Sequence, residues 1–200
     1  MSLANLITLA RLPLLLVVVA LLFVSSFGWQ FLGLILLIVL FLMDWFDGYV
    51  ARVRNEVTEM GTVLDVALDR SVENILWLIF AYLAMAPLWV PIVFLLRSFI
   101  VDGIRGVALT RGKSGFGMMH TAMGRFLVAS RFMRALYGLA KAVVFSLLYL
   151  AHALALIYPS AALALYPLNQ GLIFFTMALC VIRGIPVLLD GRIYFRAQEL

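Results

Sequence analysis

Charged residues are scarce in this sequence, and cysteine is almost absent. Asp, Glu, Lys and Arg together make up 12% of the 200 residues, whereas hydrophobic residues make up 66%. Because a soluble domain carries about one quarter charged residues, this composition excludes an ordinary soluble fold and predicts an integral membrane protein. The single Cys180 cannot form an intrachain disulfide, so the fold does not depend on a disulfide framework.

Long uncharged segments account for much of the remaining chain. Residues 12–43, 74–96 and 142–182 contain no Asp, Glu, Lys or Arg. Each segment is longer than the roughly 20 apolar residues that a spanning helix needs. The apolar runs are continuous rather than alternating, which favours helices, because a helix satisfies its backbone hydrogen bonds internally in lipid.

Turn and breaker residues divide the chain into an all-α integral membrane fold with six transmembrane helices. A short interfacial helix at residues 1–11, with Asn5, Thr8 and Arg11 spaced by three, is expected to precede them. No internal repeat is visible, so residues 1–200 are interpreted as one transmembrane domain. The six spans are expected at about 12–27, 31–53, 60–85, a stretch ending near 109, 125–150 and 172–189.

Charge is distributed unevenly between the two ends of these helices. The turns near Ser26, Pro87 and Pro159 carry no charge, whereas the basic residues gather at the opposite ends. The positive-inside tendency therefore predicts a multi-pass protein of the cell inner (cytoplasmic) membrane, with its charged end in the cytoplasm. The net charge of +5 is expected to face anionic lipid headgroups or an anionic substrate rather than nucleic acid.

Charged residues also occur inside the predicted helices, where inserting each one costs about 2.5 to 3.5 kcal/mol. Such residues face a cavity or a partner, so they predict a polar cavity that opens to the cytoplasm. They are Asp44, Asp65, Asp69, Arg97, Asp102, Arg105, Arg131, Arg134, Lys141 and Arg183.

Four aspartates stand where two successive predicted helices end and begin. Asp44 and Asp47 are three residues apart on the second helix, and Asp65 and Asp69 are four apart on the third. Each pair lies on one helical face, so the two faces can point at each other. Four close carboxylates repel one another and need a cation. Hard oxygen ligands without His or Cys nearby indicate Mg2+ or Mn2+.

Small residues beside these acids leave room for a bulky ligand to approach the backbone. They are Gly48, Ala51 and Gly61. Close helix packing is the alternative explanation for them, and pairing with Arg52 or Arg70 is the alternative explanation for the acids. A divalent-cation transporter that uses the acids as an ion path is a hypothesis of a different class.

The complete pattern from residue 44 to residue 69 is D-x2-D-G-x2-A-R-x8-G-x3-D-x3-D. It resembles the signature of the CDP-alcohol phosphotransferases, membrane enzymes of phospholipid headgroup synthesis. The resemblance implies a six-helix homodimer with an inward-facing site and two divalent ions, Mg2+ or Mn2+. It also implies transfer of a phosphatidyl-type group from a CDP-linked lipid, such as CDP-diacylglycerol, to an alcohol hydroxyl, with release of CMP.

The same resemblance implies roles for individual residues. The metals would be bound by Asp44, Asp47 and Asp65, with Asp69 as a further ligand and the general base. The N-terminal pattern N-x2-T-x2-R is similar to the family's first segment. The cytidine diphosphate would be held by Gly48, Ala51, Arg52, Thr58, Gly61, Asn5 and Thr8.

The chain from the fourth predicted helix onward contains more basic residues than are needed as ion-pair partners for the four aspartates. Arginine suits bidentate phosphate capture, so these residues favour a phosphorylated polyol as the acceptor. Anchoring of helix ends, or contact with lipid phosphates, is the alternative role for several of them. The acceptor phosphate is expected at Arg97, Arg105, Arg131, Arg134 and Lys141.

The run from Arg97 to Arg105 resembles the R-E-x2-V-x-G-x-R element of phosphatidylglycerophosphate synthases, with Ser98 in place of Glu. Arg70, where those synthases often have Lys, is closer to inositol-type members of the family. Glycerol 3-phosphate is therefore the first choice of acceptor, and inositol phosphate is the second.

Overall fold

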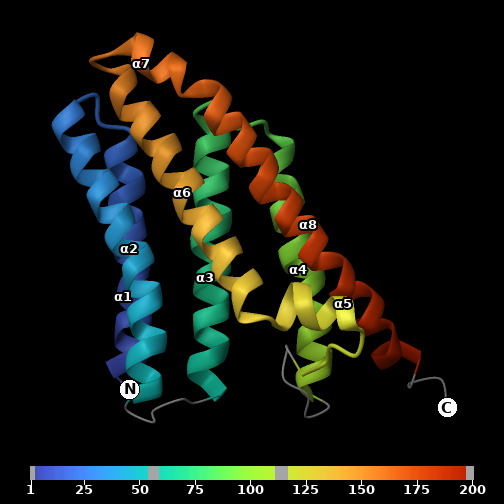
Figure 1. The fold of residues 1–200 in the computed structure, drawn as a ribbon. Helices are drawn as coiled ribbons and strands as arrows, with labels where there is room; N and C mark the ends of the chain where they lie inside the picture. Colours follow the sequence, from blue (N-terminus) through green and yellow to red (C-terminus); the bar gives the residue numbers. More distant parts are fainter. Residues whose placement is uncertain (1–2, 54–58, 111–116, 197–200) are drawn as a thin grey trace. The chain divides into compact units, whose positions relative to one another are not determined.

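Every element that the computed structural model describes is a helix (Figure 1), which confirms the all-α prediction for this part of the chain. The description covers residues 3–53, 59–110 and 117–196, with side chains for 6–46, 53, 61–110 and 117–192. The elements are α1 (Leu3–Leu22), α2 (Phe27–Val53), α3 (Glu59–Tyr82), α4 (Trp89–Thr110), α5 (Ala122–Gly124), the π-helical turn η1 (Arg125–Ala129), α6 (Arg131–Ala155), α7 (Pro159–Ala164) and α8 (Tyr166–Arg196).

Three stretches of the described chain are long and apolar enough to cross a membrane. They are Phe27–Phe46, Arg131–Ala155 and Pro159–Arg192, and Leu6–Leu22 is a shorter apolar helix. Several charged residues interrupt the apolar sequences of α3 and α4. The count of six spans and the cytoplasmic orientation stay predictions.

Several helix boundaries differ from those expected. The break expected after residue 11 is absent, because α1 continues from Leu3 to Leu22 through Pro13. Apolar helices tolerate an internal proline where neighbouring groups satisfy the freed carbonyl. Pro91 lies in the first turn of α4, where a missing N–H leaves no bond unmade. Pro159 likewise begins the short helix α7 instead of a turn.

The start of α6 is another correction. A helix was expected from Arg125, but Arg125–Ala129 forms a π-helical turn and Ser130 is extended. The Ser130 hydroxyl accepts a hydrogen bond from the backbone N–H of Met133 at 3.2 Å. This is the bond of a serine N-cap, and it explains why α6 begins at Arg131.

The described chain divides into two compact units, each assembled from separate segments. Unit 1 comprises residues 1–87 and 142–170, and unit 2 comprises residues 88–141 and 171–200. Unit 1 therefore contains α1, α2, α3, the second part of α6 and α7. Unit 2 contains α4, α5, η1, the first part of α6 and most of α8.

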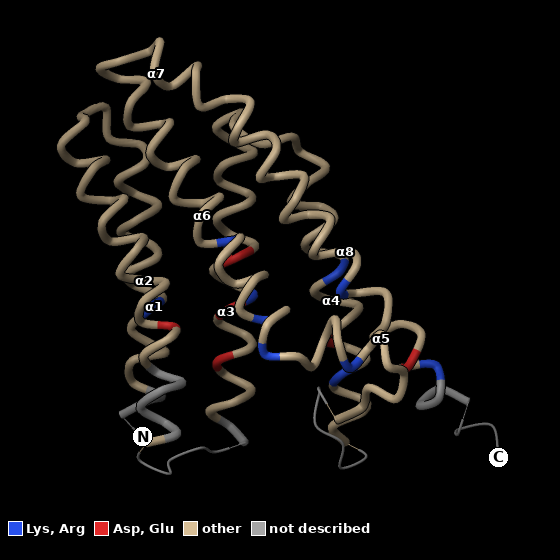
Figure 2. Tube along the Cα trace, viewed as in Figure 1, with Lys and Arg blue, Asp and Glu red and all other residues tan. Residues whose placement is uncertain are grey.

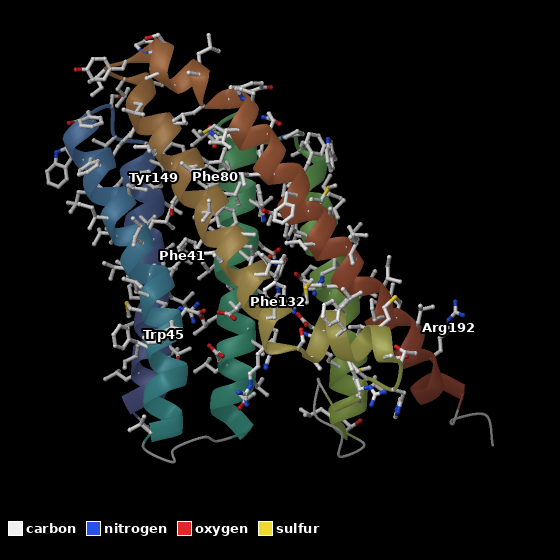
Figure 3. All side chains as sticks on the ribbon, viewed as in Figure 1. Phe41, Trp45, Phe80, Phe132, Tyr149 and Arg192 are labelled. Atoms are coloured by element: carbon white, nitrogen blue, oxygen red, sulfur yellow. The ribbon has the colours of Figure 1, made fainter. Side chains whose placement is uncertain are left out.

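An aromatic cluster forms the core of unit 1. The Phe145 ring of α6 lies 4.7 Å from the Trp77 ring, 5.9 Å from Phe80 and 6.2 Å from Phe41, measured between centroids. Figure 3 labels Phe41 and Phe80, which come from α2 and α3. Because α1 also packs against α2 and α3, the cluster and α1 hold these two helices in place.

Side chains bind carbonyl groups near the end of α1 and just beyond it, where the final carbonyls of a helix have no partners within it. Gln30 of α2 donates to the carbonyls of Leu22 and Val24 at 3.2 and 3.0 Å. The Tyr149 hydroxyl of α6 donates to the Val18 carbonyl at 3.1 Å. A β-carbon added to Gly33 of α2 would lie 1.9 Å from that hydroxyl oxygen. Glycine at this position therefore makes room for the Tyr149 ring, which is labelled in Figure 3.

The end of α3 is closed by a residue in the left-handed region. Ala84 has φ of 56°. The Met85 N–H donates to the Phe80 carbonyl at 2.9 Å, and the Ala84 N–H donates to the Ala81 carbonyl at 3.0 Å. These two bonds make a Schellman motif, in which glycine usually occupies the position of Ala84.

Close contact between α4 and α8 holds unit 2 together. Trp89 lies beside Phe174, with ring centroids 5.8 Å apart. Farther along both helices, a β-carbon on Gly184 would meet Arg97, and one on Gly191 would meet Ile104 at 2.5 Å. In these three contacts the residue numbers increase together along α4 and α8, so the two helices are parallel, as Figure 1 also shows. Small residues permit such approach between apolar helices.

We predict that Gly33→Ala lowers the free energy of unfolding by about 2 to 4 kcal/mol, because the new methyl group displaces Tyr149 and breaks its hydrogen bond. Gly28→Ala is the matched control on the same helix, since a β-carbon there meets nothing within 4 Å. Reversible unfolding in mixed detergent micelles measures both variants. Equal stability of the two would contradict the packing described.

We also predict that Ala84→Gly raises the free energy of unfolding by about 1 kcal/mol, because glycine adopts the left-handed conformation without steric cost. Ala81→Gly, inside α3, should lower it by about 1 kcal/mol. Thermal unfolding of both variants checks the prediction, and a loss of stability in Ala84→Gly would refute it.

Candidate functional site

Three of the four predicted aspartates converge in unit 1. Asp44 lies on α2, and Asp65 and Asp69 lie one turn apart on α3. One oxygen atom from each carboxylate can be chosen so that all three lie within 4.8 Å of one another. Figure 2 shows the acidic residues of unit 1 gathered in the half of its helices nearer the N-terminal end of α1. The two halves of the sequence motif therefore face each other.

An arginine from α1 joins these carboxylates. The Arg11 Nη2 atom lies 2.7 Å from Asp44 Oδ1 and 2.8 Å from Asp69 Oδ1, and Nη1 lies 3.5 Å from Asp65 Oδ1. The Arg11 side chain is only 2% exposed, whereas the three carboxylates are 37 to 44% exposed. The sequence had suggested Arg52 or Arg70 as partners of the acids and had missed Arg11.

The donor set fits a hard divalent cation. All three groups offer carboxylate oxygens, which are the ligands that Mg2+ and Mn2+ prefer. Their three formal negative charges exceed the single positive charge of Arg11, so the cluster keeps an excess of negative charge. Partial exposure also leaves the carboxylates accessible to an ion from water. The residues present are therefore consistent with the predicted metal site.

The other motif residues are described less completely. Gly61 lies one turn before Asp65 on α3 and is half-buried. The backbone at Asp47, Gly48, Ala51 and Arg52 belongs to α2, but these side chains lie outside the described residues.

At the N-terminal end of the chain, Thr8 is buried on α1, one turn before Arg11. The side chain of Asn5 also lies outside the described residues, as does the whole of Thr58.

Arg70 forms an ion pair with Glu73 one turn further along α3. The Glu73 side chain is 2% exposed. Glu73 was not among the predicted site residues, although it is an acid on the same helix as the motif. A buried acid needs a charged partner, so this pair explains how Glu73 is accommodated.

The five predicted acceptor residues all belong to unit 2, and two features distinguish Arg97 among them. It is 9% exposed, and its Nε and Nη1 atoms have no hydrogen-bond partner among the described residues. The Arg105 Nη1 atom lies 3.4 Å from Asp102 Oδ1. The Lys141 Nζ atom lies 4.7 Å from the centroid of the Tyr137 ring. The remaining two, on the first turn of α6, are exposed: Arg131 and Arg134.

Arg183 is a buried basic residue that the predicted acceptor set did not include. It donates a hydrogen bond to the Met133 carbonyl, and its guanidinium carbon lies 5.0 Å from the centre of the Tyr137 ring. Its place directly after the uncharged stretch 142–182 was a signal that the residue is unusual, but spacing gave no partner for it.

A second missed residue is Asp190 of α8, which is 3% exposed. Its Oδ2 atom accepts hydrogen bonds from the backbone N–H groups of His120 and Thr121 and from the Thr121 hydroxyl, at 3.1 to 3.3 Å. Within unit 2, Asp190 thus attaches the segment directly before α5 to helix α8.

Comparison with known proteins identifies relatives whose names state an activity. A Bacillus subtilis (strain 168) protein named CDP-diacylglycerol–glycerol-3-phosphate 3-phosphatidyltransferase is 34% identical over 125 residues, covering 56% of this chain and 64% of the relative. A Rickettsia bellii protein of the same name is 29% identical over 104 residues, covering 52% of this chain and 58% of the relative.

A third relative, from Mycobacterium bovis, carries the provisional name of cardiolipin synthase. It is 30% identical over 87 residues, covering 44% of this chain and 40% of the relative. The matched part of this chain thus spans less than two thirds of the length of each of these relatives.

The family model of the CDP-alcohol phosphatidyltransferases matches residues 1–182, which include the aspartate cluster, Arg11 and all five predicted acceptor residues. The match covers most of the chain, so the protein belongs to the CDP-alcohol phosphatidyltransferase family.

Proposed function

We propose that the protein transfers a phosphatidyl-type group from CDP-diacylglycerol to the hydroxyl of a phosphorylated polyol, with glycerol 3-phosphate as the preferred acceptor. The observation that carries this proposal is the convergence of Asp44, Asp65 and Asp69 from two helices within a chain of this family. The names of the Bacillus and Rickettsia relatives support the choice of acceptor.

Two Mg2+ or Mn2+ ions are proposed to be held by Asp44, Asp47, Asp65 and Asp69. When bound, such ions neutralise the pyrophosphate and stabilise the attacking and leaving oxygens of the displacement. The cytidine diphosphate is proposed to lie against Gly48, Ala51, Arg52, Thr58 and Gly61, with Asn5 and Thr8 contributing from α1. Small side chains at the glycines and Ala51 let the nucleotide approach the helix backbones.

The reaction needs a base and a leaving group. Asp69 takes the proton of the acceptor hydroxyl, whose oxygen forms a bond to the lipid-side phosphorus. The bond from that phosphorus to the oxygen of CMP breaks, and CMP leaves with the electron pair. Asp69 is suited to this role because its carboxylate is partly exposed and has an oxygen within 4.8 Å of oxygens of Asp44 and Asp65.

Arg97 is the strongest candidate for binding the acceptor phosphate. Burial of a guanidinium without hydrogen-bond partners is costly, and a phosphate would satisfy the Nε and Nη1 donors. Arg105, Arg131, Arg134 and Lys141 are proposed to complete the acceptor site. Arg183 joins them as an addition from the structure, since it is buried in the same unit.

The setting of this reaction is also proposed. Residues 1–200 would act as one transmembrane domain with six spans and a polar cavity open to the cytoplasm, and two copies would form a homodimer. A site at the cytoplasmic membrane surface keeps the lipid tails of the donor in the bilayer while the polar acceptor and CMP exchange with water.

We predict that Asp69→Ala lowers the rate of CMP release by about a thousand-fold or more, because the change removes both a base and a metal ligand. The assay contains purified protein, CDP-diacylglycerol, glycerol 3-phosphate and Mg2+ or Mn2+. Arg192→Gln is the control, because Arg192 is exposed and projects away from α8 in Figure 3.

Activity of Asp69→Ala equal to that of the wild type would rule out the proposed base. Faster release with inositol phosphate than with glycerol 3-phosphate would move the protein to the second choice of acceptor. Metal flux into sealed vesicles without nucleotide, together with no CMP release for any acceptor, would favour a divalent-cation transporter.

Substitution of Arg97 tests the acceptor site separately. Arg97→Met should raise the KM for glycerol 3-phosphate by about 10- to 100-fold, since a charged hydrogen bond to phosphate contributes about 1.5 to 3 kcal/mol. Arg97→Lys should show a smaller increase, because it keeps the charge but loses the planar fork. An unchanged KM for the acceptor in Arg97→Met would exclude Arg97 from the site.

A further inference from the structure

Arg11 occupies the position in unit 1 that a bound cation would need. Its Nη2 atom lies between two carboxylate oxygens from different helices, 2.7 Å from Asp44 Oδ1 and 2.8 Å from Asp69 Oδ1. Its Nη1 atom lies 3.5 Å from the third carboxylate, that of Asp65. One guanidinium thus contacts all three members of the cluster.

The position of Arg11 is fixed by the fold rather than by the cluster alone. The side chain is 2% exposed, and α1 packs against both helices that carry the acids. A guanidinium buried to this degree needs ionic partners to offset its lost hydration. The three carboxylates supply them, so Arg11 and the acids stabilise each other.

A divalent ion bound by the carboxylate oxygens that contact Arg11 would compete with the guanidinium for them. Mg2+ binds oxygen at about 2.0 to 2.1 Å, which would bring the ion close to the Nη2 atom that shares those oxygens. Two cations at that separation repel each other. We therefore expect the guanidinium to move off these oxygens when a metal binds them.

We propose that Arg11 is a positioning residue that holds the aspartates together in the metal-free protein and competes directly with the divalent metal for their oxygens. Metal binding then displaces the guanidinium, and the affinity for metal is lower than the three carboxylates alone would give. This inference rests on the proposed function only in requiring that the cluster binds a divalent ion.

Titration of the full-length protein with Mn2+ tests this competition without measuring activity. The protein is stripped of metal in detergent micelles, and free Mn2+ is followed by its electron paramagnetic resonance signal. Arg11→Ala should bind Mn2+ about ten-fold more tightly than wild type, or more. The affinity of Arg11→Lys for Mn2+ should lie between those of the wild type and Arg11→Ala, and the affinity of Arg192→Gln should equal that of the wild type.

Added methylguanidinium separates competition for the oxygens from a long-range effect of charge. In Arg11→Ala it can occupy the space left by the side chain, and it should weaken Mn2+ binding competitively. In the wild type the same concentration should have no effect. The midpoint of thermal unfolding of metal-free Arg11→Ala should lie below that of the wild type and rise on addition of Mn2+.

The outcomes separate this inference from the proposed function. If the wild type binds Mn2+ and Arg11→Ala binds it equally or more weakly, or if methylguanidinium has no effect on Arg11→Ala, competition by Arg11 is wrong while the metal site stands. If neither protein binds Mn2+, the metal site itself is wrong. Should Arg11→Ala fail to fold, Arg11→Lys decides, and affinity no higher than wild type would overturn the inference.

Discussion

Mutual repulsion of carboxylates on two facing helices is the constraint on which the site depends. Asp44, Asp65 and Asp69 lie close together in a chain whose residues are mostly apolar. A cation that lies among them offsets this repulsion. Arg11 supplies that cation in the structure, and a metal ion supplies it in the proposed reaction.

The all-helical fold could be predicted directly from the composition, but the residues at which the helices begin and end could not. Continuous apolar runs require helices in lipid, so the all-α fold could be predicted with no further information. Ser130 was a readable N-cap that was missed, and the extra turn before it moved the start of α6 by six residues. The left-handed end of α3 could not be predicted, because alanine at residue 84 gives no local signal for that conformation.

The site was predictable to the extent that it is local. Spacings of three and four residues determine which side chains share a helix face. These spacings identified the aspartates as candidate site residues. The partner of those acids is 54 to 58 residues away from Asp65 and Asp69 along the chain. Nothing in local spacing selects Arg11 over Arg52 or Arg70, because that choice depends on how α1 packs against α3. Local spacing likewise gave no partner for Arg183, and Asp190 was missed for the same reason.

The most direct test of the account is a crystal structure with Mn2+ and a CDP-linked lipid, with the metal located by anomalous scattering. We expect anomalous peaks within coordination distance of oxygens from Asp44, Asp65 and Asp69, with the Arg11 guanidinium moved away from them. A well-ordered donor with no peak at the cluster, and with Arg11 still bridging the three carboxylates, would contradict the account.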